Sequence, residues 1–484
     1  MKRRLHTLVL GLFAGLALAA TGCGGAPGTG DSTSSGAQFV RADTLVFFSV
    51  NVDTGSSQWK QLDTLSKKFP GRDLAIAKIE QTLAGKDVDY QDDVKPALGP
   101  EVDFAVGSGG TGASNITGIG LTKPDDPDKL EALVAKMNAQ PGDSPSVMKK
   151  LSDGWYALGD SQEKIDLLLK GSGKALSDES RYTDALGKLP DEALAKAYVN
   201  GAQLGDAIRE QLRSHPGSFS GSTAGLDKLD FVVAALSAED DGVRLHGAAQ
   251  GQGASVVGGS ADYSSKLLAD APSDALAFLT FRGGQNIGAG LNQMEAPFES
   301  ALGVSLKDVM KLFENENALW VRPGAVIPEF TAIFQPDDAT AGLATLDKLL
   351  RNLAAASGAT ITGGAEKTIS FGKQFQLHYA AVGGKLVITS AAAGTSGVGS
   401  PSEKLADSAD FKEATEAAGM PSSNGGFLYV DLKNAIPLIE GFASLSGENL
   451  PPAVTANLRP LRSFLEWSAG SGDSRTFDAF LEIK

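Results

Sequence analysis

Few side chains in this 484-residue sequence have the types and spacing that catalysis requires. The spacing Ser-x-x-Lys can place an amine beside a hydroxyl nucleophile on one helical turn, and it occurs three times. No Lys-Thr-Gly or Ser-Asp-Asn sequence accompanies it, and no Gly-x-Ser-x-Gly elbow is present. Three scattered matches are typical of composition, so we predict no catalytic residue and expect no enzyme. The three pairs are Ser57/Lys60, Ser146/Lys149 and Ser161/Lys164.

A glycine-rich segment, Gly107-Ser-Gly-Gly-Thr-Gly112, matches the pattern Gly-x-Gly-x-x-Gly. In a dinucleotide-binding loop this pattern must open a helix, because the backbone N–H groups and the helix dipole hold the pyrophosphate. Here Asn115-Ile-Thr-Gly-Ile follows, which is typical of a strand. The sequence therefore favours a hairpin loop, and we expect no cofactor.

Metal ligands are also sparse. Downstream of residue 22 the histidines are His215, His246 and His378, and none has the His-x-x-x-His or His-x-x-Glu spacing of a metal site. His246 and His378 fall in predicted strands, where we expect half-exposed structural residues. The duplicated Pro-Asp-Asp sequence could suggest a cation site, but helix N-capping, by Asp125 or Asp126 in the first copy, explains both copies more simply. We predict no metal site.

The residue with the best defined chemistry is Cys23, the only cysteine. Three basic residues at positions 2–4 precede an apolar run at residues 8–20, and small residues lead to the cysteine. This order is typical of an export signal, and the run is too short to span a bilayer permanently. An ordinary secretory signal ending near a cysteine by chance is the alternative. A lone cysteine has no disulfide partner, which favours use of its thiol for lipidation.

Leu18-Ala-Ala-Thr-Gly-Cys23 resembles the lipobox of bacterial lipoproteins, although Ala20 stands where leucine is usual. The resemblance implies cleavage between Gly22 and Cys23, an S-diacylglycerol on the Cys23 thiol and an N-acyl group on its new amino terminus. Two or more acyl chains anchor a protein stably, whereas one chain binds weakly. We therefore expect an extracytoplasmic protein held on the bacterial cell membrane by lipid, in which residues 1–22 are the signal peptide.

Composition and charge restrict the partners. Residues 23–38 are rich in Gly, Ser and Thr, which predicts a flexible tether. Removing residues 1–22 takes away three basic side chains and no acidic ones, so the net charge falls from −15 to −18. This balance argues against nucleic acid and against electrostatic docking on anionic lipid. With 42% apolar residues, the chain can still bury ordinary cores.

The remaining sequence reads as two copies of one pattern, residues 39–252 and 260–484, joined by a glycine-rich linker. Similar blocks recur in the same order at separations of about 212 to 236 positions, which chance does not explain. The matched blocks begin at Asp43 and Asp274, Asp93 and Asp308, Lys123 and Gln335, Gly154 and Gly384, Leu176 and Leu405, Ala197 and Leu428, and Leu229 and Leu465.

Each copy is expected to be α+β. Alternating, β-rich segments at residues 45–52, 102–106 and 116–122 predict strands, with a helix at residues 58–68 between the first two. A further helix follows, with Leu130, Leu133 and Val134 on one face. Short turns between consecutive strands favour antiparallel pairing. We predict two tandem modules built from repeating β-α-β-β units, each a mostly antiparallel sheet with helices on one face.

This pattern resembles a family of bacterial extracytoplasmic proteins known only as domain of unknown function 3352. The resemblance would cover nearly the whole mature chain, and its motifs are structural, so it transfers no catalytic residue. It implies membrane anchoring and an unassigned activity. The motifs are Ala42-Asp-Thr-Leu-Val-Phe-Phe-Ser-Val50, Lys67-Lys-Phe-Pro-Gly71, Asp93-Val-Lys-Pro-Ala-Leu-Gly99, and Leu176, Tyr182 and Ala185 leading to Tyr198-Val-Asn200.

Two classes of function remain. We expect a non-catalytic binding or scaffold lipoprotein, whose partner is a protein, a cell-wall polymer or a lipid held by the sheet or a groove between the modules. The alternatives are a carrier of an apolar or lipid ligand, which an apolar cavity would favour, and a cell-envelope hydrolase. A cleft that gathers His, Asp and Ser from distant segments would favour the hydrolase.

Overall fold

The computed structural model describes the chain from Ser35 to the C-terminus with short gaps. The predicted signal peptide, Cys23, residues 109–112 of the glycine-rich segment, His215 and residues 255–259 of the linker lie outside the described residues. Among the described residues, no helix has both the length and the apolar character needed to cross a membrane. The described residues are 35–108, 116–139, 145–214, 228–254, 260–283, 295–325, 327–372, 375–445, 447 and 450–484.

The first half of the chain alternates strands and helices much as the sequence predicts. Its strands are β1 (Val46–Asn51), β2 (Glu101–Ser108), β3 (Ile116–Thr122), β4 (Val147–Lys150), β5 (Tyr156–Gly159), β6 (Ala195–Asn200), β7 (Leu229–Glu239) and β8 (Gly242–Gly251). Its helices are α2 (Ser57–Ser66), α3 (Arg72–Ala84), α4 (Lys95–Leu98), α5 (Pro127–Asn138), α6 (Gln162–Leu168), α7 (Ser180–Leu186) and α8 (Gly201–Ser214).

The second half follows a similar order. Its strands are β9 (Ala277–Arg282), β10 (Glu316–Arg322), β11 (Glu329–Phe334), β12 (Thr360–Gly363), β13 (Lys367–Phe371), β14 (Phe375–Val382), β15 (Lys385–Thr389), β16 (Gly426–Asp431), β17 (Leu461–Ser471) and β18 (Ser474–Ile483). Its helices are α10 (Glu295–Leu302), α11 (Leu306–Met310), α12 (Ala339–Ser357), α13 (Ala409–Ala418), α14 (Leu432–Leu445) and α15 (Pro452–Leu458).

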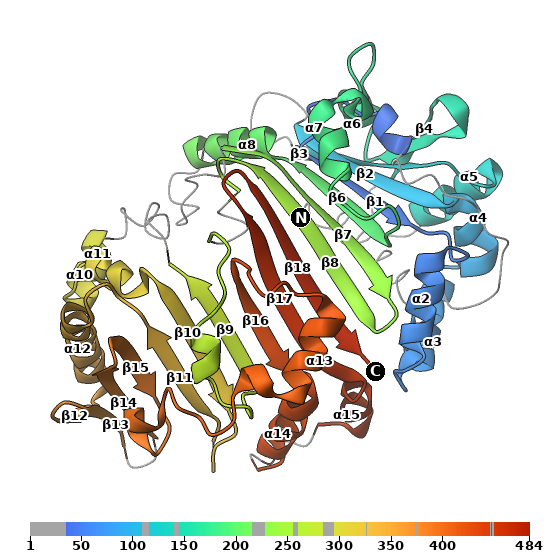
Figure 1. The fold of residues 1–484 in the computed structure, drawn as a ribbon. Coiled ribbons are helices and arrows are strands. Elements are labelled where there is room, and N and C mark those ends of the chain that lie inside the picture. Colours follow the sequence, from blue (N-terminus) through green and yellow to red (C-terminus); the bar gives the residue numbers. More distant parts are fainter. Residues whose placement is uncertain are drawn as a thin grey trace.

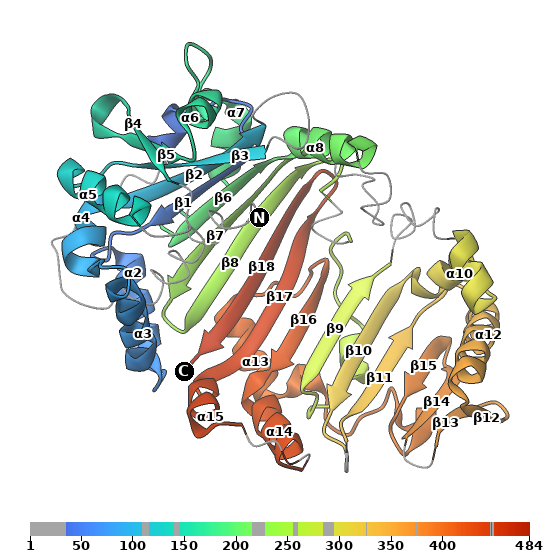
Figure 2. The ribbon, with the colours of Figure 1, turned by 180° about the vertical axis from the view of Figure 1, so that it is seen from behind.

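The eighteen described strands form one sheet, and every pairing in it is antiparallel. The two halves of the chain meet at β8 and β18, which pair along nearly their whole length. Figures 1 and 2 show this curved sheet from its two sides, with the β8–β18 pair in its middle. From edge to edge the strand order is β4, β5, β3, β2, β1, β6, β7, β8, β18, β17, β16, β9, β10, β11, β15, β14, β13 and β12.

Helices cover both faces of the sheet, so the expectation of helices on one face is wrong. In β15, Leu386 packs in the core under α12, whereas Val387 packs with α13. In β5, Tyr156 packs with α5, and Ala157 belongs to the core under α6 and α7. Successive residues of a strand point to opposite faces. Helices α5 and α12 therefore lie on the face opposite α6, α7 and α13.

The middle of the face that carries α5 and α12 is not covered by a described helix, as Figure 2 shows. We call this region the open face. It contains a row of ladder partners that crosses from β7 to β10, and three of its leucines are 38–39% exposed. The row is Leu236, Leu245, Ala479, Glu466, Leu428, Leu279 and Leu319.

The fold begins earlier than the sequence predicts. Residues Ser35–Gln38 form a short 3₁₀ helix, η1, in which Ala37 is fully buried. The backbone N–H of Gly36 donates to Asp103 Oδ2 at 3.1 Å, and the hydroxyl of Ser49 donates to the other oxygen of this buried carboxylate. The predicted tether, residues 23–38, therefore extends too far, because its last four residues form η1, which is bonded to Asp103 of β2 through Gly36.

Candidate functional site

The pairs that could have been catalytic have structural roles. The Ser161 hydroxyl accepts a hydrogen bond from Lys164 N at 3.2 Å and caps the first turn of α6. The Ser57 hydroxyl donates to Glu192. In the third pair, the Lys149 ammonium bonds to Asp166. None of these lysines is hydrogen-bonded to the serine of its own pair through side chains within the described residues.

The two histidines that the structure describes, His246 and His378, lie in strands, as expected. His246 in β8 bonds to Asp478 Oδ1 through Nδ1 at 2.9 Å and to the Lys188 carbonyl through Nε2 at 3.2 Å. His378 in β14 bonds to Thr368 Oγ1 at 3.1 Å. Across the described ranges, no group of three His, Cys, Asp or Glu side chains could hold a metal ion.

The two Pro-Asp-Asp sequences do cap helices. Asp126 Oδ1 accepts from Asp128 N at 3.0 Å at the start of α5, and Asp338 Oδ1 accepts from Thr340 N at 2.9 Å at the start of α12. Both residues have extended backbone, which an N-cap requires. The predicted N-caps are confirmed.

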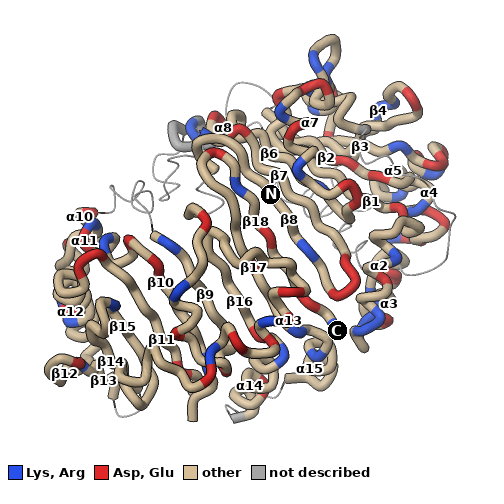
Figure 3. The backbone as a smooth tube through the Cα atoms, viewed as in Figure 1, with Lys and Arg blue, Asp and Glu red and all other residues tan. Residues whose placement is uncertain are grey.

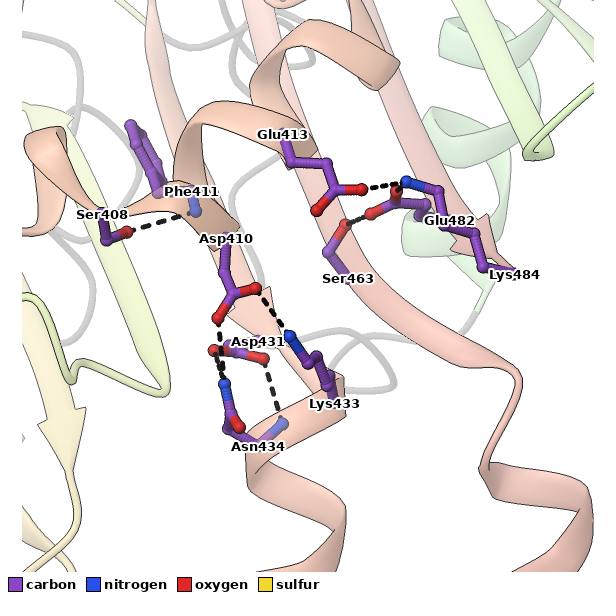
Figure 4. A network of polar contacts seen from close by, with 10 residues as sticks. All are labelled: Ser408, Asp410, Phe411, Glu413, Asp431, Lys433, Asn434, Ser463, Glu482 and Lys484. Carbon is purple, nitrogen blue, oxygen red and sulfur yellow. Dashed lines mark hydrogen bonds and ion pairs between the residues drawn. The ribbon is translucent and has the colours of Figure 1, made fainter.

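Charged and polar residues gather elsewhere, around a pocket of about 230 Å³ in the second half of the chain, where Tyr429, Asp431, Ser463 and Glu482 are buried. Its walls come from α13, the ends of β16, β17 and β18, and the start of α14. Figure 3 shows acidic and basic segments side by side around the end of β18, and Figure 4 shows most of the side chains. The lining residues are Asp410, Glu413, Tyr429, Asp431, Lys433, Arg462, Ser463, Glu482 and Lys484.

A β-bulge shapes one wall. Leu461 pairs with Ile483 and Phe464 pairs with Leu481, so β17 carries one more residue than β18 between these pairs. The two residues at this irregularity, Arg462 and Ser463, both line the pocket. A bulge interrupts the strict alternation of side chains, which allows two neighbours to reach the same cavity.

Asp431 forms the adjoining wall at the junction of β16 and α14. Its carboxylate accepts from Asn434 N at 3.0 Å and from Asn434 Nδ2 at 2.7 Å, so it holds the first turn of α14. Asp431 is only 7% exposed. Its pKa is raised because burial disfavours the charged form.

Two ion-paired groups flank this carboxylate, as Figure 4 shows. Lys433 Nζ donates to Asp410 Oδ1 at 2.9 Å, and this bond raises the pKa of Lys433. On the other side, Lys484 bonds to Glu413 and lies 2.7 Å from Glu482 Oε1. Hydrogen bonds to Glu413 and then Glu482 raise the pKa of Lys484, and the bond from Lys484 lowers the pKa of Glu413.

Two donors in the pocket are left over. The buried Nε atom of Arg462 has no hydrogen-bond partner, and Arg462 forms no ion pair with another described residue. Tyr429 is 1% exposed, and its hydroxyl has no hydrogen-bond partner among the described residues. Burial raises the pKa of this hydroxyl, so it remains a proton donor at neutral pH. Such groups are costly to bury without a partner, and a ligand can supply one.

The first half of the chain shows that the strands can pair at this point without a carboxylate and a hydroxyl. In β6 and β7, Asn200 pairs with Phe231, a 3% exposed core residue, beside the same kind of strand irregularity. In β16 and β17, Asp431 pairs with Ser463. In the first half, this ladder pair consists of an apolar side chain and a neutral amide. In the second half, the corresponding pair consists of a buried hydroxyl and a buried carboxylate.

Sequence reasoning missed this pocket. Asp431 and Tyr429 were matched with Asn200 and Tyr198 as the end of a strand, but no motif joins them to Arg462 or Glu482. The sequence signal that could have indicated it is the difference between Asn200 and Asp431 at the ends of the two matched blocks. A carboxylate where the other block has a neutral amide, at a buried strand end, needs an explanation.

Known structures resemble the chain only weakly. Crystal form IV of TP0453 matches with 11% identity and a TM-score of 0.25, over 46% of this chain and 94% of that one. Crystal forms I and III of TP0453 match with 10% and 12% identity, each with a TM-score of 0.23 and over 46% of this chain, and over 79% and 93% of those chains. No curated protein matches the chain significantly.

A family model matches residues 162–483, about two thirds of the chain, and so includes every residue of the pocket except Lys484. The chain therefore belongs to the family described as Protein of unknown function (DUF3352).

Proposed function

We propose that this protein is an extracytoplasmic lipoprotein, anchored by lipid on Cys23, whose folded body binds a small polar ligand without catalysing a reaction. The single observation that carries the binding function is the pocket lined by charged and polar residues, in which the buried Nε atom of Arg462 has no hydrogen-bond partner. At the matched junction of the first half, Phe231 fills the corresponding ladder position. A polar cavity that the scaffold does not require is best explained by a ligand.

The anchor rests on the lipobox-like sequence around Cys23 and on the point at which the fold begins. With the fold starting at Ser35, residues 23–34 are left as a tether. A Gly-rich chain of this length has a mean reach of ~20 Å. Such a reach is enough to lift the folded body clear of the headgroup layer while the protein stays at the membrane.

We also propose that the two halves arose by duplication. The support is the strand order, in which β1 lies between β2 and β6 just as β9 lies between β10 and β16. The caps Asp126 and Asp338 begin the corresponding helices α5 and α12. The symmetric order continues to the centre, where β8 of one half pairs with β18 of the other.

The open face supports a second candidate, a carrier of an apolar ligand. Two of its exposed leucines, Leu236 and Leu245, are ladder partners, and exposed apolar patches commonly mark interaction surfaces. Binding of a fluorescent fatty acid that is lost in Leu236→Ser/Leu245→Ser would favour this candidate over the pocket.

The anchor is tested by fractionation. Cys23→Ala should release the protein from membranes into the soluble fraction, with Ser32→Ala in the expected tether as the matched control that stays bound. Retention of Cys23→Ala in the membrane fraction would refute lipid anchoring through this residue.

The binding function is tested by thermal shift with a panel of anionic, cationic, zwitterionic and neutral small molecules. At least one compound should raise the Tm of the wild-type protein and leave Arg462→Gln unaffected. Ser463→Phe, which introduces the residue found at position 231, should fill the cavity and abolish the same shift. A panel that shifts none of the wild-type transitions, or shifts all three proteins equally, contradicts binding in the pocket.

A further inference from the structure

Most charged groups around the pocket form ion pairs with one another, and the groups that form none indicate which kind of ligand could bind. Lys433 forms an ion pair with Asp410, and Lys484 forms ion pairs with both Glu413 and Glu482. The Glu482 carboxylate also accepts from the Ser463 hydroxyl at 2.7 Å. Asp431 has hydrogen bonds from Asn434 but forms no ion pair with a described residue.

One carboxyl group and one cationic group of the pocket therefore form no ion pair with a described residue: Asp431, whose nearest basic neighbour Lys433 is bonded to Asp410, and Arg462. They line the same cavity, yet they are not paired with each other, since no ion pair joins them. If the site existed only for stability, the simplest arrangement would be a direct Arg–Asp bond, which is short and often bidentate.

We propose that the pocket binds a small molecule carrying both a primary ammonium and an anionic group, with the ammonium on Asp431 and the anion on Arg462 and the Tyr429 hydroxyl. This inference rests on the proposed function, because it names the ligand of the same pocket. Each end of such a ligand supplies the partner that one wall lacks. A free α-amino acid and a phosphoethanolamine headgroup both have this chemistry.

The cavity and its field favour this class over ligands with one kind of charge. A volume of about 230 Å³ fits a molecule of a few non-hydrogen atoms and is below the range of ~300–1,000 Å³ usual for drug-sized ligands. A dicarboxylate would bring a second anion toward Asp431 and Glu482. A diamine would leave Arg462 unpaired and add a cation near it. A zwitterion alone compensates both walls.

The test is calorimetric titration of the mature lipoprotein in detergent. The probes are glycine, D-alanine, L-alanine and L-glutamate in one arm and glycerophosphoethanolamine in the other, with propionate and propylamine as single-charge analogues. We expect at least one zwitterion to bind roughly tenfold or more tightly than either analogue, because each lost charge-assisted hydrogen bond weakens binding by about that factor. Binding of a compound in the first arm would identify a free amino acid as the ligand, and binding in the second arm would identify a phosphoethanolamine headgroup.

Two variants assign the ends of the ligand. Arg462→Gln should weaken the zwitterion roughly tenfold or more and leave propylamine binding unchanged, whereas Asp431→Asn should weaken the zwitterion and leave propionate binding unchanged. Asp431→Asn should still fold, because Asn200 accepts from Gln203 N at 3.3 Å at the corresponding start of α8. Arg459→Gln removes an exposed charge three residues from Arg462 and is the matched control.

The outcomes separate this inference from the proposed function. If propionate or propylamine binds as tightly as the zwitterions, or if neither arm binds while another compound of the thermal-shift panel does, the ligand class is wrong and the binding function stands. If zwitterion binding is unaffected by Arg462→Gln and by Asp431→Asn, the assignment to this pocket is overturned. Unchanged unfolding midpoints of the variants would show that lost binding does not come from lost structure.

Discussion

A histidine at the junction of the two halves should make the stability of the sheet depend on pH. His246 in β8 reaches across to Asp478 in β18 through Nδ1, and its Nε2 faces the Lys188 carbonyl. Both partners are acceptors, so both ring nitrogens must donate, which only the imidazolium can do. The pKa of His246 is accordingly raised, chiefly by its hydrogen bond to Asp478 and against the effect of burial.

The sign of the effect follows from this shift. A raised pKa in the folded state means that the bond stabilises fully below the unfolded pKa of about 6.5 and that the contribution is lost as pH rises through the folded value. A charge-assisted hydrogen bond contributes ~1.5–3 kcal/mol. Because the His246 and Asp478 side chains are 25% and 12% exposed, solvent screening reduces this to about 1–2 kcal/mol.

The assay is urea denaturation of wild type and His246→Gln at pH 6 and pH 9. The wild type should be about 1–2 kcal/mol more stable relative to the variant at pH 6 than at pH 9. Asp478→Asn should remove the same pH-dependent difference, since it removes the acceptor that holds the imidazolium. An equal difference between wild type and His246→Gln at the two pH values would refute the assignment of a charged histidine at the β8–β18 junction.

Two further predictions concern the scaffold. Asp126→Ala and Asp338→Ala should each reduce the free energy of unfolding by ~1 kcal/mol, because each removes an N-cap. Circular dichroism during urea denaturation measures this loss. Asn at either position should restore most of it. Phe231→Ala should cost ~3–5 kcal/mol by opening a cavity in the core under α7, measured by the same unfolding curves, and a cost below about 1 kcal/mol would contradict its core position.

Local features of the fold could be predicted from the sequence. The strand at Ile116–Thr122 has its expected bounds, and the caps Asp126 and Asp338 hold the helices that they were expected to hold. These features depend on alternation over a few residues or on one side chain reaching its own helix. Neighbours along the chain therefore decide them, and a single sequence contains the required information.

Features that depend on distant partners could not be predicted. The apolar pattern of β15 does not say which face α12 covers, because Leu386 and Val387 are both buried, on opposite faces. The early start of the fold was also hidden, since η1 is held by Asp103, more than sixty residues away. In both cases the deciding contact is made only after the sheet has assembled.

One sequence match was wrong in register. Phe231 was matched with Trp467 because both are aromatic and precede a closing strand. The ladders place Phe231 opposite Asn200, whereas the corresponding Asp431 lies opposite Ser463. Aromatic residues recur wherever a strand faces the core, so similarity of type shows shared burial and does not fix register. The error also concealed the pocket, because it hid the exchange of Phe231 for Ser463.

That exchange bears on why a duplicated scaffold would carry its site in one half. The buried carboxyl groups of Asp431 and Glu482 weaken the part of the core that contains them unless each finds a partner. In the first half the corresponding junction keeps Phe231 and adds to the core. Because β8 and β18 join both halves into one sheet, a stable first half can support a polar second half. Phe231→Ser should therefore cost much more stability than Ser463→Ala, because only Phe231 contributes an aromatic ring to the core, and urea denaturation of the two variants measures the difference.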